Sequence, residues 1–411
     1  MPGYARQILP GFLLAKENAM SFASFHHGTR LQESNETPVL VQIAQTAVVG
    51  LLGTAPDADP NQFPLNTPVL LKGTPTEAAG LGETGTLKDA VDDVFDQVGA
   101  YTIVIRVEEG EDTAATLSNL VGDATTLTGV HALKKAEAQL GIKPRLIAIP
   151  GFTSGDGATT NPVVAELIGV LDQLKAVAFV DGPDTTDEDA IAYRELIGSQ
   201  RIYVVDPKVL VWDTTASAYV ARPASARFAG VQARVDTNLG FWHSLSNKAI
   251  NGIGGASRTV TYGSQADYLN EAHVGTIINM GSGFITWGNR SATDEDLWVF
   301  LAVRRTADFI NEAMEKAYLE FVDKPFSAAN LKFMLESGNA AMRTFKASGA
   351  IIGGRVWIDE TLNEPTQMAA GKITLSMEFE PPAPMEDIRF IAHRNIQYYL
   401  DLTATALQAA S

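Results

Sequence analysis

The chain has 411 residues, with 31 Lys and Arg against 48 Asp and Glu, so its formal net charge is −17. Nucleic-acid and anionic membrane surfaces are bound by clustered basic side chains, so this balance argues against both as partners. The absence of cysteine excludes disulfides, thiolate metal sites, iron–sulfur clusters and cysteine nucleophiles. At about 150 residues per domain, the length indicates two or three domains.

The first part of the chain contains no segment that we expect to span a membrane. The longest apolar stretch, Val39–Gly53, is interrupted by Gln42, Gln45 and Thr46. It is also shorter than the ~20 residues that a spanning helix needs. We therefore interpret it as strands of a folded domain, and residues 1–19, before Met20, as an extension or flexible segment.

Residues 101–206 alternate short β-rich runs with helical stretches, which is typical of an α/β layer with buried strands. Two segments have helix-compatible spacing, Pro162–Lys175 and Asp187–Ile197. The predicted strands are Thr102–Val107, Arg145–Pro150, Ala176–Asp181 and Arg201–Asp206.

The clearest helix signal lies between residues 303 and 321, where apolar residues recur every three or four positions. Glu312, Lys316 and Glu320 follow each other at i, i+4 on another face of this helix. Ser327 is suited to cap a second helix that ends at Gly349. The short connection predicts a helical hairpin or elbow.

Strands are predicted to close the chain. Lys372–Glu380 alternates strictly between apolar and polar residues, which indicates a half-buried antiparallel strand. A similar alternation predicts strands through Ile388, Phe390 and Ala392 and through Ile396, Tyr398 and Leu400.

One loop of the sequence has residues that could form a catalytic site. The six histidines include no pair at i, i+4, so we expect no metal site, and the glycine-rich run Gly151–Pro162 lacks a Gly-Lys-Ser/Thr ending. Carboxylates cluster at Asp181–Asp189 after a predicted strand end, where α/β proteins often place active sites. An α/β hydrolase or transferase using this loop is one hypothesis. The same residues are also explained as a turn and a capped helix start.

Several longer motifs favour a different class of protein from the hydrolases and transferases. Together they resemble the sheath proteins of contractile-tailed bacteriophages and R-type bacteriocins, in family order over residues 22–405. These motifs are Phe25–Leu71, Ile147–Ser154, Val180–Thr186, Tyr203–Thr214, Arg222–Gly230, Gly240–Ile253, Thr286–Ser291, Val303–Ile310 and Ser348–Asn363.

The resemblance implies a structural subunit without catalytic centre, metal or cofactor. Sheath subunits form stacked hexameric rings around an inner tube and contract to drive that tube through a cell envelope. The implied partners are neighbouring subunits, the tail tube protein, and baseplate and tail-terminator proteins. The implied location is a virion tail or bacteriocin particle, assembled in the bacterial host cytoplasm. A non-contractile self-assembling shell protein is the remaining alternative.

The implied fold is an inner α+β sheath domain with an inserted outer α/β domain and two β-strand arms. We expect the N-terminal arm and the start of the inner domain at 20–45, the outer domain at 46–270, the inner C-terminal domain at 271–395 and the C-terminal arm at 396–411. By strand exchange, the arms would link neighbouring subunits. Their candidate residues are Phe22, Phe25, Thr29, Leu31, Ile396, Tyr398, Leu400 and Leu402. The candidates for binding acidic groups of the tube are Lys316, Lys324, Lys332, Arg343 and Lys346.

Overall fold

A computed structural model describes residues 45–409 of the chain. Its main element is a mixed sheet, nine-stranded within the described residues, with the order β2-β3-β1-β4-β5-β6-β11-β12-β9. The six strands from β3 to β11 are parallel, whereas β2, β12 and β9 run antiparallel to their neighbours. The strands are β1 (Val49–Thr54), β2 (Pro68–Leu71), β3 (Thr102–Val107), β4 (Leu146–Ala148), β5 (Val177–Asp181), β6 (Ile202–Val205), β9 (Lys248–Ala249), β11 (Val274–Asn279) and β12 (Phe284–Trp287).

Helices cover both faces of this sheet, as the alternation of its side chains requires. In β5, Ala178 and Val180 join the core on one face, whereas Val177 and Phe179 join the core on the other. The first face is covered by α2 (Thr113–Val121), η2 (Gly129–Lys134), α3 (Lys135–Leu140), α4 (Pro162–Leu174), α5 (Asp187–Glu195) and α7 (Gln265–Glu271). The second face is covered by η1 (Pro75–Leu81), α1 (Leu87–Phe95) and α6 (Ser225–Asn238).

The strands and helices predicted between residues 101 and 206 are confirmed, with ends shifted by a few residues. A small second sheet, with the order β10-β7-β8, follows this layer. It consists of β7 (Val209–Asp213), β8 (Ala218–Arg222) and β10 (Gly255–Ala256).

The large sheet extends past residue 270. Val274 and Gly275 of β11 pair with Val204 and Val205 of β6, and β12 then pairs with β11. The expected boundary between residues 270 and 271 therefore falls inside one hydrogen-bonded layer.

The C-terminal part has its own core. After η3 (Asp296–Trp298) come α8 (Leu301–Tyr318), η4 (Leu319–Phe321) and α9 (Ala328–Ser348). Ser327 accepts a hydrogen bond from the amide of Asn330, and Gly349 ends α9 in the left-handed region at φ 85°. The Tyr318 hydroxyl donates to the Met334 carbonyl, 2.8 Å away, so the two helices form the predicted hairpin.

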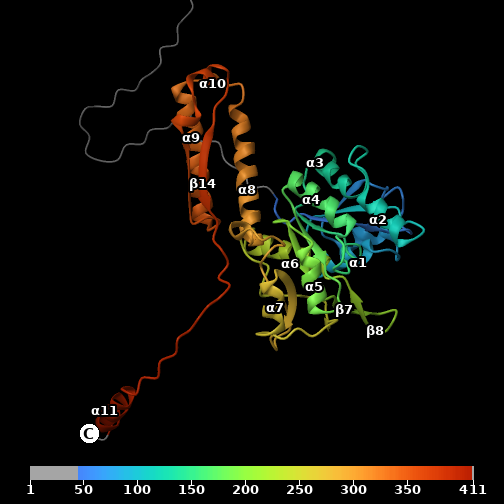
Figure 1. Cartoon of the computed structure of the whole chain (residues 1–411), viewed down its shortest axis with the longest axis vertical. Helices are drawn as coiled ribbons and strands as arrows, with labels where there is room; N and C mark the ends of the chain where they lie inside the picture. Colours follow the sequence, from blue (N-terminus) through green and yellow to red (C-terminus); the bar gives the residue numbers. More distant parts are fainter. Residues whose placement is uncertain (1–44, 410–411) are drawn as a thin grey trace, which may run out of the picture. The chain divides into compact units, whose positions relative to one another are not determined.

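An antiparallel pair of strands packs on α9 (Figure 1). It joins β13 (Gly353–Ile358) to β14 (Leu375–Glu380), with η5 (Glu360–Leu362) and α10 (Pro365–Ala369) between them. The strand predicted at 372–380 is confirmed.

The two last predicted strands are wrong. Residues 381–395 have no regular secondary structure, and α11 (Tyr398–Ala409) is helical. The alternation of Ile396, Tyr398 and Leu400 specifies a strand only when a neighbouring strand supplies backbone hydrogen bonds, and none of the described residues does so.

Candidate functional site, an ionic joint between helix α8 and the sheet

Three basic residues stand at the start of three neighbouring parallel strands. Arg145 directly precedes β4, Lys175 precedes β5 by two positions and Arg201 directly precedes β6. Because β4, β5 and β6 are adjacent and parallel, their first residues lie at the same edge of the sheet. The edge therefore presents a row of three cations.

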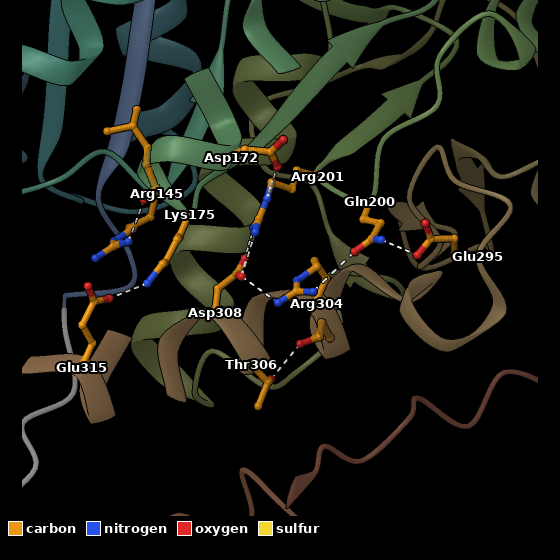
Figure 2. Close-up of polar contacts among 12 residues, drawn as sticks. Arg145, Asp172, Lys175, Gln200, Arg201, Glu295, Arg304, Thr306, Asp308 and Glu315 are labelled. Carbon is orange, nitrogen blue, oxygen red and sulfur yellow. Dashed lines mark hydrogen bonds and ion pairs between the residues drawn. The ribbon is translucent and has the colours of Figure 1, made fainter. Parts of the chain in front are cut away.

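Helix α8 presents three acids to this row. Asp308, Glu312 and Glu315 are spaced by four and three residues, so they lie on one face of the helix. Arg201 pairs with Asp308, Arg145 with Glu312, and Lys175 with Glu315 at 2.8 Å. We call these six residues the ionic joint. Figure 2 shows the Arg201–Asp308 and Lys175–Glu315 pairs.

Glu312 is the most enclosed acid of the joint, with 2% of its surface exposed. Its Oε1 accepts from Lys316 Nζ at 2.9 Å and lies 3.4 Å from Lys143 Nζ. Burial opposes its ionisation, but Lys316, Arg145 and Lys143 outweigh burial and lower the pKa of Glu312 from 4.5 to about 2. Glu312 is thus a buried carboxylate held ionised by three cations.

Arg145 completes this part of the joint on the sheet side. The side chain is itself buried, with 3% exposed, and its Nη1 donates to the Leu174 carbonyl at 3.1 Å. Its guanidinium carbon lies 5.4 Å from the centre of the Phe309 ring, within cation–π range. The pair is therefore surrounded by protein and weakly screened by salt.

Asp308 binds two arginines. Its Oδ1 accepts from Arg201 Nη2 at 2.9 Å and from Arg304 Nη2 at 2.8 Å (Figure 2). Arg201 Nε also donates to Asp172 at 2.8 Å. Burial disfavours the charged form of Arg201, but Asp308 and Asp172 more than compensate and raise its pKa. Arg304 stacks on Trp298 at 4.2 Å, which fixes its orientation.

A second buried pair ties α8 to the opposite layer. Arg305 Nη1 donates to Asp236 Oδ1 of α6 at 2.9 Å, and its Nη2 binds the other carboxylate oxygen. Gln232 donates to the same Asp236 oxygen at 2.7 Å. Helix α8 is therefore anchored both to the strand starts and to a covering helix.

This arrangement joins helix α8 to the strand starts through charge pairs. The carboxylate oxygens of Asp308 and Glu312 face cations of the chain itself. Removing one partner of a buried ion pair typically costs 3–5 kcal/mol, because the other charge stays buried without compensation. The sequence interpretation grouped Glu312 with Lys316 and Glu320 on a polar face and did not identify the joint. A basic residue before each of three successive strands was the available signal.

The candidate catalytic loop has a structural role. Asp181 is buried, and its carboxylate accepts from the Ser225 amide at 2.9 Å and the Ser225 hydroxyl at 2.7 Å. It thereby caps the start of α6, and burial raises its pKa. Thr186 caps α5, as the alternative explanation required, and Asp189 accepts from Thr185 at 2.7 Å. These oxygens are engaged by neighbouring donors of the same fold.

Among residues 45–409, no group of three His, Asp or Glu side chains has an arrangement suited to a metal ion. No helix in that range combines the length and hydropathy of a membrane span.

The fold is that of solved sheath structures. The helical sheath of the anti-feeding prophage in its contracted state matches with a TM-score of 0.70 and 21% identity, over 90% of this chain and 99% of that one. The contracted sheath complex of the extracellular contractile injection system PVC matches with a TM-score of 0.67 and 19% identity, over 92% and 100%.

Sequence comparison decides the family. The model of the phage tail sheath protein central domain matches residues 125–292, and that of the phage tail sheath C-terminal domain matches residues 293–393. The tail sheath protein of Escherichia phage P2 is 33% identical over 93% of this chain and 99% of its own length. The chain belongs to the tail sheath protein family. A putative prophage major tail sheath protein of Pseudomonas aeruginosa is also 33% identical, over 89% of this chain and 96% of its own length.

These comparisons confirm the resemblance stated from the sequence. They lend no support to the hydrolase or transferase hypothesis or to the non-contractile shell. The two sheath-domain models meet between residues 292 and 293, just after β12, where the large sheet ends along the chain.

The five basic candidates for tube binding do not form one cluster in this sheath-family chain. Lys316 binds Glu312 of the joint, and Lys324 pairs with Glu320 at 3.3 Å. The other three lie on α9, within about 60° of each other around the helix axis at 100° per residue. They are Lys332, Arg343 and Lys346.

The arm candidates lie partly within and partly outside the residues that the structure describes. Phe22, Phe25, Thr29 and Leu31 lie outside the described residues. Each of the C-terminal candidates exposes more than 60% of its surface: Ile396, Tyr398, Leu400 and Leu402.

Proposed function

We propose that this sheath-family chain polymerises as stacked hexameric rings around an inner tail tube, and that the assembly contracts to drive the tube through a cell envelope. One observation carries this proposal. Beyond β14 the chain exposes a series of large apolar side chains, with Phe390 at 91% and Ile391 at 82%. Apolar surface of this extent is typical of a segment that a partner covers.

The partner is a second copy of the chain, and the acceptor is the β13–β14 sheet. An isolated two-stranded sheet is marginally stable, and within the described residues neither strand has another neighbour. A strand added from a neighbouring copy would pair the free N–H and C=O groups at the edges of this sheet. It would also bury the apolar side chains of the arm. We assign the donated strands to the N-terminal arm and to residues 385–402, where α11 would have to unwind.

Deletion of residues 385–411, which removes the whole assigned strand, tests this assignment. We expect the shortened chain to keep the urea-unfolding midpoint of the full chain but to form no tubes or stacked rings under the electron microscope. Trp212→Ala, which removes another exposed aromatic side chain, should polymerise like the full chain. A deletion variant that still forms tubes would refute the role of this arm.

The ionic joint would make each subunit a rigid body. Its pairs connect the β13–β14 acceptor region, through α8, to the large sheet. Displacement of the inner part during contraction would then move the outer part with it. The outer body would extend from about residue 46 to residue 292 and the inner part from there to residue 395, between the two arms.

The basic face of α9 would contact the tube. Exposed ion pairs contribute about 0–1 kcal/mol each, which suits an interface that must release as the sheath widens. The remaining proposed partners are baseplate and tail-terminator proteins, in a particle assembled in the host cytoplasm. The proposal includes no catalytic centre, cofactor, nucleic-acid contact or membrane insertion.

A further inference from the structure

The motif Thr286–Ser291 contains an arginine that the joint does not use. Arg290 binds Glu386 through two parallel hydrogen bonds, from Nε to Oε1 at 2.9 Å and from Nη2 to Oε2 at 2.7 Å. Glu386 lies six residues after the end of β14, on the segment that leads to the C-terminal arm. A bidentate arginine–carboxylate pair fixes orientation as well as distance.

Two further contacts orient the Arg290 side chain, which is 33% exposed. Its Nη1 lies 3.2 Å from His273 Nε2, and its guanidinium carbon lies 5.7 Å from the centre of the Phe300 ring. Burial and the nearby Arg194 and Arg290 lower the pKa of His273, so its ring is neutral beside the arginine. The two donors that remain, Nε and Nη2, form a fork directed at a carboxylate.

The segment that receives this fork has little else to hold it. Within the described residues, no backbone–backbone hydrogen bond involves residues 381–395. The other ion pair of this stretch among them joins Arg389 to the nearby Asp387. Pro381 is buried at the start of the stretch, but residues 385–395 are exposed. Within residues 45–409, the Arg290–Glu386 pair is therefore the hydrogen-bonded contact that ties this stretch to a distant part of the chain.

We propose that the Arg290–Glu386 pair is a latch that directs the C-terminal arm toward its acceptor on a neighbouring copy. The inference rests on the proposed function, because it assumes that the arm is donated. An inhibitory contact would cover the apolar side chains of the arm, but Ile388, Phe390 and Ile391 are exposed. The pair therefore leaves the arm free to bind a neighbouring copy.

The latch shortens the free tether of the arm. Ile388 stands eight residues beyond the end of β14 but two residues beyond Glu386. The pair is partly exposed, with 33% of the Arg290 side chain and 37% of the Glu386 side chain accessible, so it raises the population of the directed arm by at most about fivefold. Releasing the latch should slow polymer formation by up to a similar factor.

The test compares Glu386→Gln with the matched control Asp387→Asn, which removes a neighbouring charge that pairs only with Arg389 among the described residues. Tube formation by full-length protein is followed by light scattering and electron microscopy. We expect Glu386→Gln to assemble up to about fivefold more slowly and Asp387→Asn to match the unmodified chain. The charge exchange Arg290→Glu with Glu386→Arg should recover part of the rate.

A second measurement uses unpolymerised protein and does not depend on the proposed function. Trypsin should cut after Arg389 faster in Glu386→Gln than in the unmodified chain, relative to its cut after Arg394. Equal cutting would overturn the latch even if no variant polymerised. If the unmodified chain forms tubes, equal or faster assembly of Glu386→Gln would overturn the directing role. Failure of the unmodified chain to assemble would refute the proposed function alone.

Discussion

Replacing Glu312 with Gln should destabilise the protein by about 3 kcal/mol at neutral pH. The variant keeps the shape of the side chain but leaves Arg145, which is 3% exposed, without its carboxylate. The pKa of Glu312 falls from 4.5 to about 2, and each unit corresponds to 1.36 kcal/mol, which gives about 3 kcal/mol. This agrees with the 3–5 kcal/mol expected when one partner of a buried pair is removed.

Urea unfolding followed by tryptophan fluorescence measures this effect. Trp298 is the natural probe, because it stacks on Arg304 beside the joint. With a slope of about 3 kcal/mol per molar urea, the midpoint should fall by about 1 M. The control is Glu336→Gln on α9, whose carboxylate is 55% exposed and 3.6 Å from Lys332, and which should change stability by less than about 1 kcal/mol.

The pH dependence gives this prediction a second signature. A carboxyl group with a lowered folded-state pKa stabilises the fold above its unfolded value of 4.5. That contribution is lost as the pH falls from 4.5 toward 2, so the unmodified chain and Glu312→Gln should converge there. A variant within 0.5 kcal/mol of the unmodified chain at pH 7, on the order of the effect of an ordinary surface substitution, would refute the ionic joint as a source of stability.

Three further outcomes are expected. Burial raises the pKa of Asp206 to about 6 despite Arg258, so its contribution to stability is full below 3.8 and is lost as the pH rises through 6. The stability advantage of the unmodified chain over Asp206→Asn should therefore be larger at pH 4 than at pH 7 in urea titrations; a constant difference would contradict this. Arg343→Glu combined with Lys346→Glu should weaken co-sedimentation with the tail tube while leaving the unfolding midpoint unchanged; undiminished binding would exclude this face of α9. Ser327→Ala should lower the free energy of unfolding by about 1 kcal/mol through loss of the α9 cap, whereas Ser327→Asp should preserve it.

The sequence was informative where structure depends on nearby residues. Ser327 and Gly349 mark the ends of α9 through local hydrogen bonds and backbone conformation, so both ends were predictable. The strands between residues 101 and 206 were predictable for the same reason, because their apolar runs are continuous and bounded by helices.

Local sequence patterns of this kind did not predict the ionic joint. Glu312 has the spacing of a solvated helix residue, and its partner Arg145 lies 167 positions away. Local periodicity distinguishes polar from apolar positions but does not show which polar position will meet a distant cation. The strand prediction for the C-terminal segment was wrong for a related reason. The alternation at Ile396, Tyr398 and Leu400 does not specify which strand would pair with it.

The spacing of charges along α8 also opposes its sliding along the sheet. A shift by one turn in one direction would bring Arg304 to the position of Asp308, opposite Arg201. A shift in the other direction would bring Lys316 to the position of Glu312, opposite Arg145. Each alternative register sets one cation against another and keeps only one of the three pairs, so a one-turn ratchet inside the subunit is disfavoured. If sheaths of such subunits contract as proposed, this register favours changes of length at the contacts between subunits over sliding of α8 within them.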